Sequence, residues 1–284
     1  MCIRRTDAII TTTLMVAGLL LWLPQIRVGA EPGDTKSRDE SAETTRLIAA
    51  ELPNWKFWKG VDRASELELE PKSVLRWTNP GTGRVYGDLY LWTANGRPEV
   101  AMSLFKAWEP ANGFHVELHS LSLLPLEAER NRKVVWQPRK AGVDLRNVPD
   151  AAAPADTPIR RLTQMRALAN EFSVNLTDYR QNKAGEKQAL RLLPQPIYRY
   201  RSVDTDLIDG AMFVFVLGTD PEVFLLLEGH RLKEVTNWQF GLARMNDSPL
   251  IVMHKQEEVW RVDRASSRDD LRDPYVLMRV PETP

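Results

Sequence analysis

Apolar and polar residues alternate along much of this chain, in short runs that are separated by turn residues. Such alternation is typical of half-buried β-strands. Strands are therefore expected near 85–93, 98–108, 114–123 and 133–137, and in a second series near 197–201, 211–217, 223–228, 238–245, 250–254 and 258–262. Asn95-Gly96, between the first two runs, is a strong hairpin signal, because both residues tolerate the positive φ of a type I′ turn.

One helix is expected before each series of strands. The first covers about 39–52, and the second begins at Asp156-Thr157-Pro158, a capping residue followed by proline in the first turn. From 159 to 172, apolar residues recur at the spacing of one buried helix face. These elements predict an α+β fold of two similar halves, each a helix packed on an antiparallel β-meander.

The two halves also resemble each other in sequence. A shift of 123 positions aligns identical residues: Arg76 with Arg199, Gly87 with Gly210, Pro98 with Pro221 and Glu99 with Glu222. This similarity predicts an internal duplication. The first half would cover residues 46–138 and the second half 156–265, with a connector at 139–155 and a C-terminal tail at 266–284.

The first thirty residues have the pattern of a secretory signal peptide. Arg4 and Arg5 precede an apolar run at 8–23, and Val28-Gly29-Ala30 offers small residues at the positions that a signal peptidase reads. The run is shorter than the ~20 residues that cross a bilayer core, so we expect cleavage rather than a retained membrane anchor. Residues 31–45 are charged and small, and they are expected to form a flexible leader.

Composition narrows the class of protein. The 38 basic residues balance the 38 acidic ones, so charge suggests neither nucleic acid nor an acidic membrane surface as a partner. The single cysteine, Cys2, lies within the predicted signal peptide, which leaves the mature chain without a disulfide or a thiolate metal cluster. We therefore expect an exported protein (periplasmic, envelope-associated or extracellular) with no cofactor and no stable membrane insertion after signal cleavage.

The first sheet is expected to carry one mixed aromatic and polar face. This expectation assumes that Asn95-Gly96 is a two-residue loop, so that paired positions of the hairpin sum to 191. The predicted ligand-binding residues on this face are Tyr86, Asp88, Tyr90, Trp92, Glu99, Glu117 and His119. The second half has apolar residues in place of four polar groups of the first sheet, so the fold itself does not require those four: Ala211 for Asp88, Leu226 for Ser103, Phe240 for Glu117 and Leu242 for His119.

Three kinds of site compete for this face. A metal site from His115, Glu117 and His119 is disfavoured, because a strand places the two histidines ~13 Å apart. A catalytic triad from Asp88, Ser103 and His119 has serine between the acid and the histidine, although the histidine must contact both. The third kind is a shallow surface where aromatic rings stack on a sugar or peptide and carboxylates hydrogen-bond it. Alternatively, these aromatics pack under a loop or against the other half.

Two segments of the second half carry a resemblance. The runs R-L-L-P-Q-P-I-Y-R-Y at 191–200 and D-G-A-M-F-V-F-V-L-G-T-D-P-E-V at 209–223 resemble an uncharacterised family of exported bacterial proteins, as does the run at 76–98. The resemblance covers most of the mature chain. It implies an exported bacterial setting, and it assigns no activity and no site residues.

Together these observations predict an exported, non-enzymatic binding or interaction module for an extracytoplasmic ligand or protein. One alternative is a hydrolase that acts on a glycan or peptide, with Asp88, Glu99 or Glu117 as general acid and base. A structural envelope protein is the other alternative.

Overall fold

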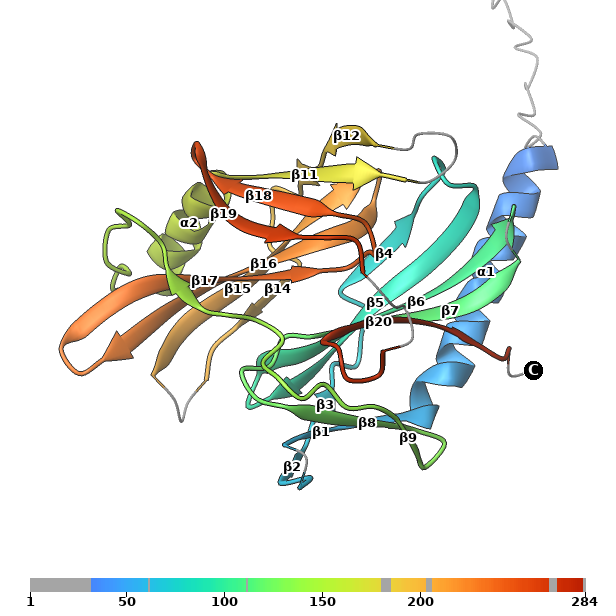
Figure 1. Cartoon of the computed structure of the whole chain (residues 1–284), viewed down its shortest axis with the longest axis horizontal. Helices are drawn as coiled ribbons and strands as arrows, with labels where there is room; N and C mark the ends of the chain where they lie inside the picture. Colours follow the sequence, from blue (N-terminus) through green and yellow to red (C-terminus); the bar gives the residue numbers. More distant parts are fainter. Residues whose placement is uncertain are drawn as a thin grey trace, which may run out of the picture.

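The computed structural model describes residues 32–60, 62–110, 112–179, 185–202, 206–265 and 270–282 (Figure 1). The predicted signal peptide at 1–30 lies outside the described residues. The described chain contains two helices, α1 (Pro32–Glu51) and α2 (Pro158–Ala169), and a short 3-10 helix, η1 (Leu52–Asn54). No helix in these ranges is long and apolar enough to cross a membrane.

The predicted α+β class is wrong. Strands make up 53% of the structure and helices 14%, so the protein is mostly β. Neither half is a helix on a single meander, because the described strands form four antiparallel sheets. The sequence pattern located the long strands, but it missed others such as β1 and β11, which build two additional sheets.

Sheets A and B, with α1, form what we call the N unit. Sheet A has the order β2 (Ser65–Glu66), β1 (Trp55–Lys59), β8 (Leu126–Arg130) and β9 (Lys133–Trp136). Sheet B has the order β20 (Tyr275–Val280), β7 (Gly113–Ser120), β6 (Arg97–Glu109), β5 (Arg84–Ala94) and β3 (Glu68–Leu69), and β4 (Leu75–Thr78) also pairs with β5.

Sheets C and D, with α2, form the C unit, which uses the same strand order. Sheet C has the order β10 (Arg146–Asn147), β17 (Val235–Arg244), β16 (Asp220–Leu232), β15 (Leu207–Leu217) and β13 (Arg191–Leu192), and β14 (Tyr198–Tyr200) also pairs with β15. Sheet D has the order β12 (Glu186–Ala189), β11 (Phe172–Asp178), β18 (Leu250–His254) and β19 (Glu257–Val262).

The outer strands of sheets B and C are exchanged between the units. β20 follows β19 of the C unit in the chain, yet it pairs with β7 of the N unit, with Tyr275 opposite His119. β10 follows β9 of the N unit and pairs with β17 of the C unit, with Arg146 opposite Phe240. The expected tail at 266–284 therefore contains β20, and the expected connector at 139–155 contains β10.

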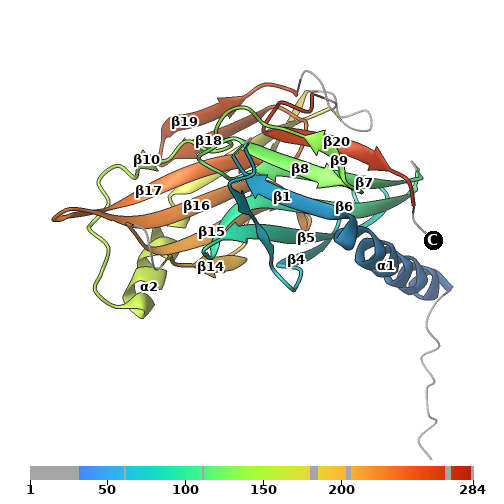
Figure 2. The ribbon, with the colours of Figure 1, turned by 90° about the horizontal axis from the view of Figure 1, so that it is seen from below.

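Three apolar cores hold the four sheets together as layers. One core lies between sheets A and B beneath α1, and another lies between sheets C and D beneath α2. The third core joins the units, where Leu89, Leu91 and Ala101 of sheet B contact Met212 and Phe224 of sheet C. Sheets B and C are therefore covered on both faces, and the two helices lie at opposite ends of the molecule (Figure 2).

The predicted hairpin at Asn95-Gly96 is confirmed, but its expected register holds only near the turn. Asn95 and Gly96 have φ of 50° and 82°, and Ala94 pairs with Arg97. A β-bulge then leaves Glu99 as an extra residue, so that Trp92 pairs with Val100. Because a one-residue shift moves side chains to the opposite face, the predicted grouping of residues on sheet B is wrong beyond the bulge.

Sheet C has the same bulge. Phe215 pairs with Val223 and Val216 pairs with Pro221, which leaves Glu222 as the extra residue. Pro98 occupies the matching position in sheet B, where Thr93 pairs with it. Proline lacks the N–H of a regular ladder and is accommodated at bulges, which explains why these residues recur in both units.

An aromatic ring also covers a glycine in each unit. A Cβ on Gly87 would lie 2.5 Å from the Trp77 ring, and one on Gly210 would lie 2.4 Å from the Tyr200 ring. Both glycines lie on the central strands β5 and β15, so only a residue without a side chain lets the ring lie flat on the sheet.

The predicted start of the second helix is confirmed. The Thr157 hydroxyl accepts a hydrogen bond from the Arg160 amide, and Pro158 is the first residue of α2. α1 begins at Pro32, before the expected start near residue 39, so the described part of the expected leader is helical.

Candidate functional site

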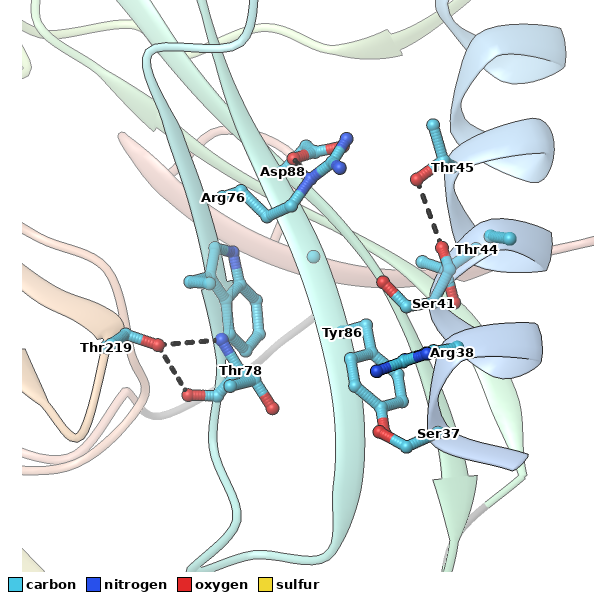
Figure 3. A pocket seen from close by; sticks show the side chains of 13 residues that line it. Ser37, Arg38, Ser41, Thr44, Thr45, Arg76, Thr78, Tyr86, Asp88 and Thr219 are labelled. Carbon is cyan, nitrogen blue, oxygen red and sulfur yellow. Dashed lines mark hydrogen bonds and ion pairs between the residues drawn. The ribbon is translucent and has the colours of Figure 1, made fainter. Parts of the chain in front are cut away.

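An open groove of about 630 Å³ runs between α1 and strands β4 and β5, and it reaches the β15–β16 turn of the C unit (Figure 3). Hydroxyl groups dominate the wall that α1 contributes, and an arginine, an aspartate and two aromatic rings come from the strands. The polar lining includes Ser37, Ser41, Thr45, Arg76, Thr78, Tyr86, Asp88 and Thr219.

An ion pair lies on the strand side of the groove. Arg76 of β4 donates from Nε to Asp88 Oδ1 at 2.9 Å and from Nη2 to Oδ2 at 3.2 Å. The Asp88 side chain is 3% exposed, whereas the Arg76 side chain is 63% exposed. The hydrogen bond to Asp88 raises the pKa of Arg76, so the guanidinium remains charged. The pair thus presents a fixed planar donor group to the groove.

The α1 side contributes hydroxyls at helical spacing. Ser37 and the Tyr86 hydroxyl lie 2.8 Å apart, and Thr45 donates to the Ser41 carbonyl at 3.0 Å. An ion pair between Arg84 of β5 and Glu40 at 2.9 Å fastens this part of the helix to the sheet. The hydroxyls retain acceptor capacity toward the groove, because each oxygen has two lone pairs.

At the corresponding place in the C unit, an ion pair joins the helix to the sheet. Arg161 of α2 donates to Asp209 Oδ2 at 2.8 Å, and Arg199 of β14 donates to the same carboxylate. Arg199 also donates to the carbonyl of Pro158 at the start of α2. By strand pairing, Asp209 corresponds to Tyr86. One buried carboxylate therefore joins helix to sheet in the C unit, where the N unit has a groove.

The structure divides the seven predicted site residues among different places. Tyr86 and Asp88 line the groove. Trp92 is 2% exposed and packs on Phe57 of sheet A, with ring centroids 4.6 Å apart, and Tyr90 contacts the same core. Trp92 therefore stabilises the N unit and presents no face to a ligand.

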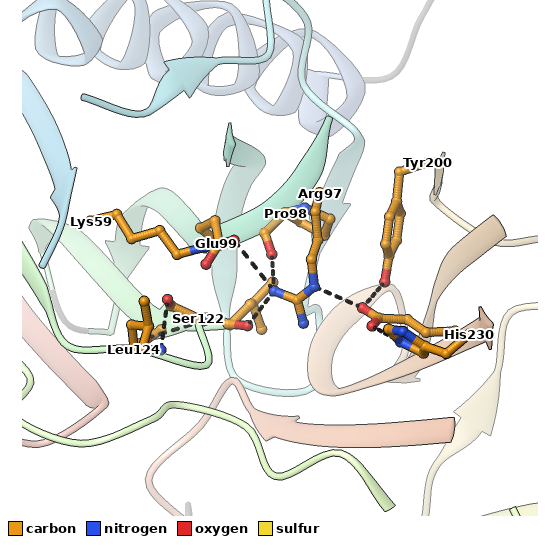
Figure 4. A network of polar contacts seen from close by, with 11 residues as sticks. Lys59, Arg97, Pro98, Glu99, Ser122, Leu124, Tyr200 and His230 are labelled. Atoms are coloured by element: carbon orange, nitrogen blue, oxygen red, sulfur yellow. Dashed lines mark hydrogen bonds and ion pairs between the residues drawn. The ribbon is translucent and has the colours of Figure 1, made fainter. Parts of the chain in front are cut away.

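Glu99, the bulge residue, belongs to a polar network that crosses the contact between the units (Figure 4). Lys59 of β1 donates to Glu99 Oε1 at 2.7 Å. Arg97, two residues before Glu99, donates to Glu228 Oε1 of the C unit at 3.0 Å. The network thus joins sheets A, B and C, and its position indicates a structural role for Glu99.

The C-unit end of this network surrounds one buried carboxylate. Tyr200 donates to Glu228 Oε1 at 2.8 Å, and His230 Nε2 lies 2.9 Å from Oε2. Burial opposes ionisation of Glu228, but the charge of Arg97 and the two hydrogen bonds hold its pKa below the usual value. Glu228 is therefore ionised and paired with Arg97 across the interface.

Glu117 and His119 lie on the face of sheet B that is opposite to Asp88. Tyr275 of β20 hydrogen-bonds the Glu117 carboxyl, and His119 Nδ1 lies 2.7 Å from the Ser120 carbonyl oxygen. Burial raises the pKa of Glu117 to about 8 and lowers that of His119 to about 4, so both groups are neutral at pH 7. These two residues do not share a surface with Tyr86 and Asp88.

Neither the metal site nor the catalytic triad, both disfavoured from the sequence, is formed by the described residues. No three side chains of His, Cys, Asp or Glu cluster there as metal ligands. Ser103 Oγ accepts a hydrogen bond from the Trp77 indole at 3.0 Å, and Asp88 lies on the other face of the sheet. Asp88, Glu99 and Glu117 also lie in three separate environments, so no pair of them forms a general acid and base around one described cavity.

Sequence reasoning missed the wall that α1 contributes to the groove. Ser37, Ser41 and Thr45 recur every four residues, which is a signal for one face of a helix. The segment was instead expected to be a flexible leader up to residue 45. Which strands this face would meet depends on tertiary packing and has no local signal.

Comparisons of this chain with known protein families, with curated proteins and with solved structures find no match. The fold and the groove define the class on their own: a mostly β protein of two facing sheet pairs, with an open polar groove on one of them.

Proposed function

We propose that this protein is an exported, non-enzymatic binding protein that takes a saccharide in the groove between α1 and β4–β5. The observation that carries the proposal is the groove itself, which lies in the N unit at the place where an Arg161–Asp209 ion pair joins helix to sheet in the C unit. Its volume of about 630 Å³ lies within the range of small-molecule sites.

The chemistry of the lining supports a saccharide. Sugar hydroxyls donate and accept hydrogen bonds, and the groove offers both partners: the Arg76 guanidinium as donor, and the serine and threonine oxygens of α1 as acceptors. The Tyr86 ring adds an aromatic surface with a polar end. The exported bacterial setting is part of the proposal and rests on the sequence of residues 1–30.

The hydrolase alternative has less support. Asp88 is held by Arg76, Glu99 by Lys59 and Glu117 by Tyr275, in three separate environments. Glycoside hydrolysis needs two carboxyl groups that flank one bond. A purely structural envelope role would leave the open groove without an occupant.

A groove-filling variant tests the proposal. Wild-type protein without its first thirty residues is applied to a glycan array and a peptide array, and the captured glycans are then titrated by calorimetry. Ser41→Trp places an indole in the groove, so we expect it to weaken glycan capture at least tenfold. Ala49→Trp, on an exposed part of the same helix, is the matched control and should bind as the wild type does.

Two results would overturn the proposal. Folded wild-type protein that captures no glycan would exclude a saccharide, and capture of peptides alone would reassign the groove. Glycan capture that survives Ser41→Trp unchanged would place the binding site elsewhere. Near- and far-UV circular dichroism of each variant ensures that a loss of capture does not reflect unfolding.

A further inference from the structure

A second cavity, of about 540 Å³, lies between the units near the segments that lead to the exchanged strands β10 and β20. Its buried wall comes from three strands: His119 of β7, Arg244 of β17 and Tyr275 of β20. Its exposed rim includes Lys140, Ala141 and Asp144 before β10 and Asp263, Arg264 and Asp270 before β20. Both units therefore contribute to this cavity, which is separate from the groove beneath α1.

Arg244 is the feature that points to a ligand. Its guanidinium is held by three backbone carbonyls, with Nε donating to Asn246, Nη1 to Asp263 and Nη2 to Ser248, at 2.7–3.0 Å. Its hydrogen-bond partners among the described residues are these three carbonyl oxygens, and the residue is only 8% exposed. Three of its five N–H groups are used, which leaves one on each terminal nitrogen.

The charges of Asp247 and Asp273 favour the charged guanidinium of Arg244, but neither carboxylate forms an ion pair with it among the described residues. Burial raises the pKa of Glu117, behind Tyr275, to about 8, so the carboxyl is protonated at pH 7. Burial lowers the pKa of Arg244 below its ordinary value, and the nearby acidic groups offset only part of that effect. The Tyr275 ring lies 5.1 Å from the guanidinium carbon, an arrangement that orients the cation without balancing its charge.

His119 supplies a second, different recognition group. It is 5% exposed, lines the cavity and is neutral at pH 7, because burial lowers its pKa to about 4. Its Nδ1 lies 2.7 Å from the Ser120 carbonyl oxygen and must donate to it, so Nε2 carries the lone pair. Nε2 makes no hydrogen bond to another residue in the described ranges, which leaves a buried acceptor for a ligand donor.

We infer that this cavity binds a small monocarboxylic acid that also carries a hydroxyl or amide donor, with the carboxylate on Arg244 and the donor on Nε2 of His119. Arginine N–H groups on two nitrogens match the two oxygens of a carboxylate. A sugar acid or a hydroxy acid has both groups, and the volume suits such a molecule.

The rim explains why one negative charge is preferred over two or three. The lining includes the acidic residues Asp144, Asp263, Asp270 and Asp273 and the basic residues Lys140 and Arg264. The excess of carboxylates repels a second negative charge at the entrance, while the single buried cation satisfies one carboxylate. Citrate and inorganic phosphate should therefore bind more weakly than a monocarboxylate of similar size.

Calorimetric titration of the protein without its first thirty residues tests this inference, with glucuronate and lactate as probes. Glucose, citrate and sulfate are the comparison compounds. We expect saturable binding of at least one probe, at least tenfold tighter than that of citrate or sulfate, and no detectable binding of glucose in this cavity. Arg244→Lys keeps the charge but loses the paired N–H groups, and it should weaken binding at least tenfold.

A blocking variant separates ligand contact from folding, because Arg244 also holds three carbonyls. Ala141→Trp fills the exposed rim and should abolish binding, whereas Ala152→Trp, exposed on the same connector and outside the lining, should not. Ser41→Trp blocks the groove and should leave monocarboxylate binding intact, so the test of this cavity is independent of the test of the groove. Failure of folded wild-type protein to bind either probe, sulfate binding of equal strength, or binding that survives Ala141→Trp would overturn the inference.

Discussion

The N and C units use the same strand order but fasten their helices to the sheets differently. In the C unit, Asp209 is buried beneath α2 and accepts hydrogen bonds from Arg161 and Arg199. In the N unit, Tyr86 stands at the corresponding position and meets Ser37 of α1 through a single hydrogen bond. The N unit also has a charged contact between helix and sheet, Arg84 with Glu40, but at the position of Asp209 it has the Tyr86 hydroxyl, which lines the groove beside α1.

This difference shows how one strand framework can serve two purposes. The residues that recur in both units, such as the bulge residues Glu99 and Glu222, build the framework. The residues that differ at corresponding positions decide whether a cavity forms. Burial alone does not distinguish residues that stabilise the fold from residues that line a site, since Asp88 and Asp209 are both buried. Asp88 lines the groove, whereas Asp209 joins helix to sheet.

The largest expected effect comes from removing the charge that joins α2 to sheet C. In Asp209→Asn, Arg161 and Arg199 lose their shared carboxylate, and Arg161 is only 10% exposed. We expect a loss of about 3 kcal/mol in the free energy of unfolding, measured by urea titration with circular dichroism, because a buried cation remains unpaired.

Asp88→Asn is the matched variant in the N unit. Arg76 is 63% exposed and stays hydrated after the change, so the expected loss is about 1 kcal/mol. Equal losses for the two variants would show that the strand-to-strand pair of the N unit and the helix-to-sheet pair of the C unit are energetically alike, which would break the comparison.

The glycines beneath aromatic rings should respond alike in both units. Gly87→Ala and Gly210→Ala bring a methyl group within 2.5 Å of the Trp77 or Tyr200 ring, so the ring must move. We expect each variant to lose about 2 kcal/mol in the same urea titration. Gly81→Ala is the control, because its methyl group meets only the Asn79 side chain at 3.3 Å. A large loss at Gly210 with none at Gly87 would mean that the rings are not equivalent.

A further expected effect is a dependence of stability on pH that originates in the N unit. Strand pairing places Gly241 and Ala243 of the C unit at the positions of Glu117 and His119, so only the N unit has this buried titratable pair. The folded pKa of Glu117, about 8, lies above its ordinary 4.5, so the folded state holds the extra proton and stability falls as pH rises between these values.

His119 acts in the opposite direction. Its folded pKa, about 4, lies below its ordinary 6.5, so stability falls as pH drops from 6.5 toward 4. The two slopes oppose each other below pH 6.5, and the Glu117 contribution stands alone above it. From pH 6.5 to 8 we expect the wild type to lose about 1.5 kcal/mol by urea titration, and Glu117→Gln to lose much less. The same alkaline slope in both proteins would contradict this assignment.

Much of the strand pattern could be predicted from sequence, because alternation and turn residues are local signals. The long hairpin of sheet B and the cap of α2 at Thr157 follow from such signals. The fold class could not be predicted in the same way. Sheets A and D depend on pairings between distant short strands, such as β1 with β8 and β11 with β18, and no local pattern encodes those partners.

The site was predictable only in part for a similar reason. Tyr86 and Asp88 were found, but the bulge at Glu99 changed which residues of β6 share their face. Pro98, just before the bulge, was an available signal, because proline within a central strand marks an interruption of the ladder. Arg244 and Tyr275 had no such signal, since the exchanged strand β20 brings them to His119 from distant parts of the chain.

The exchange of β20 also sets an order of events during synthesis. Glu117 and Tyr275, which are hydrogen-bonded in the folded protein, are 158 residues apart in the chain. Sheet B therefore keeps an open edge while the ribosome makes the whole C unit, and β7 gains its last neighbour only when β20 emerges. The half that is translated first is completed last: a nascent chain that stops after β19 has every strand of the C unit but leaves β7 of the N unit as an open edge.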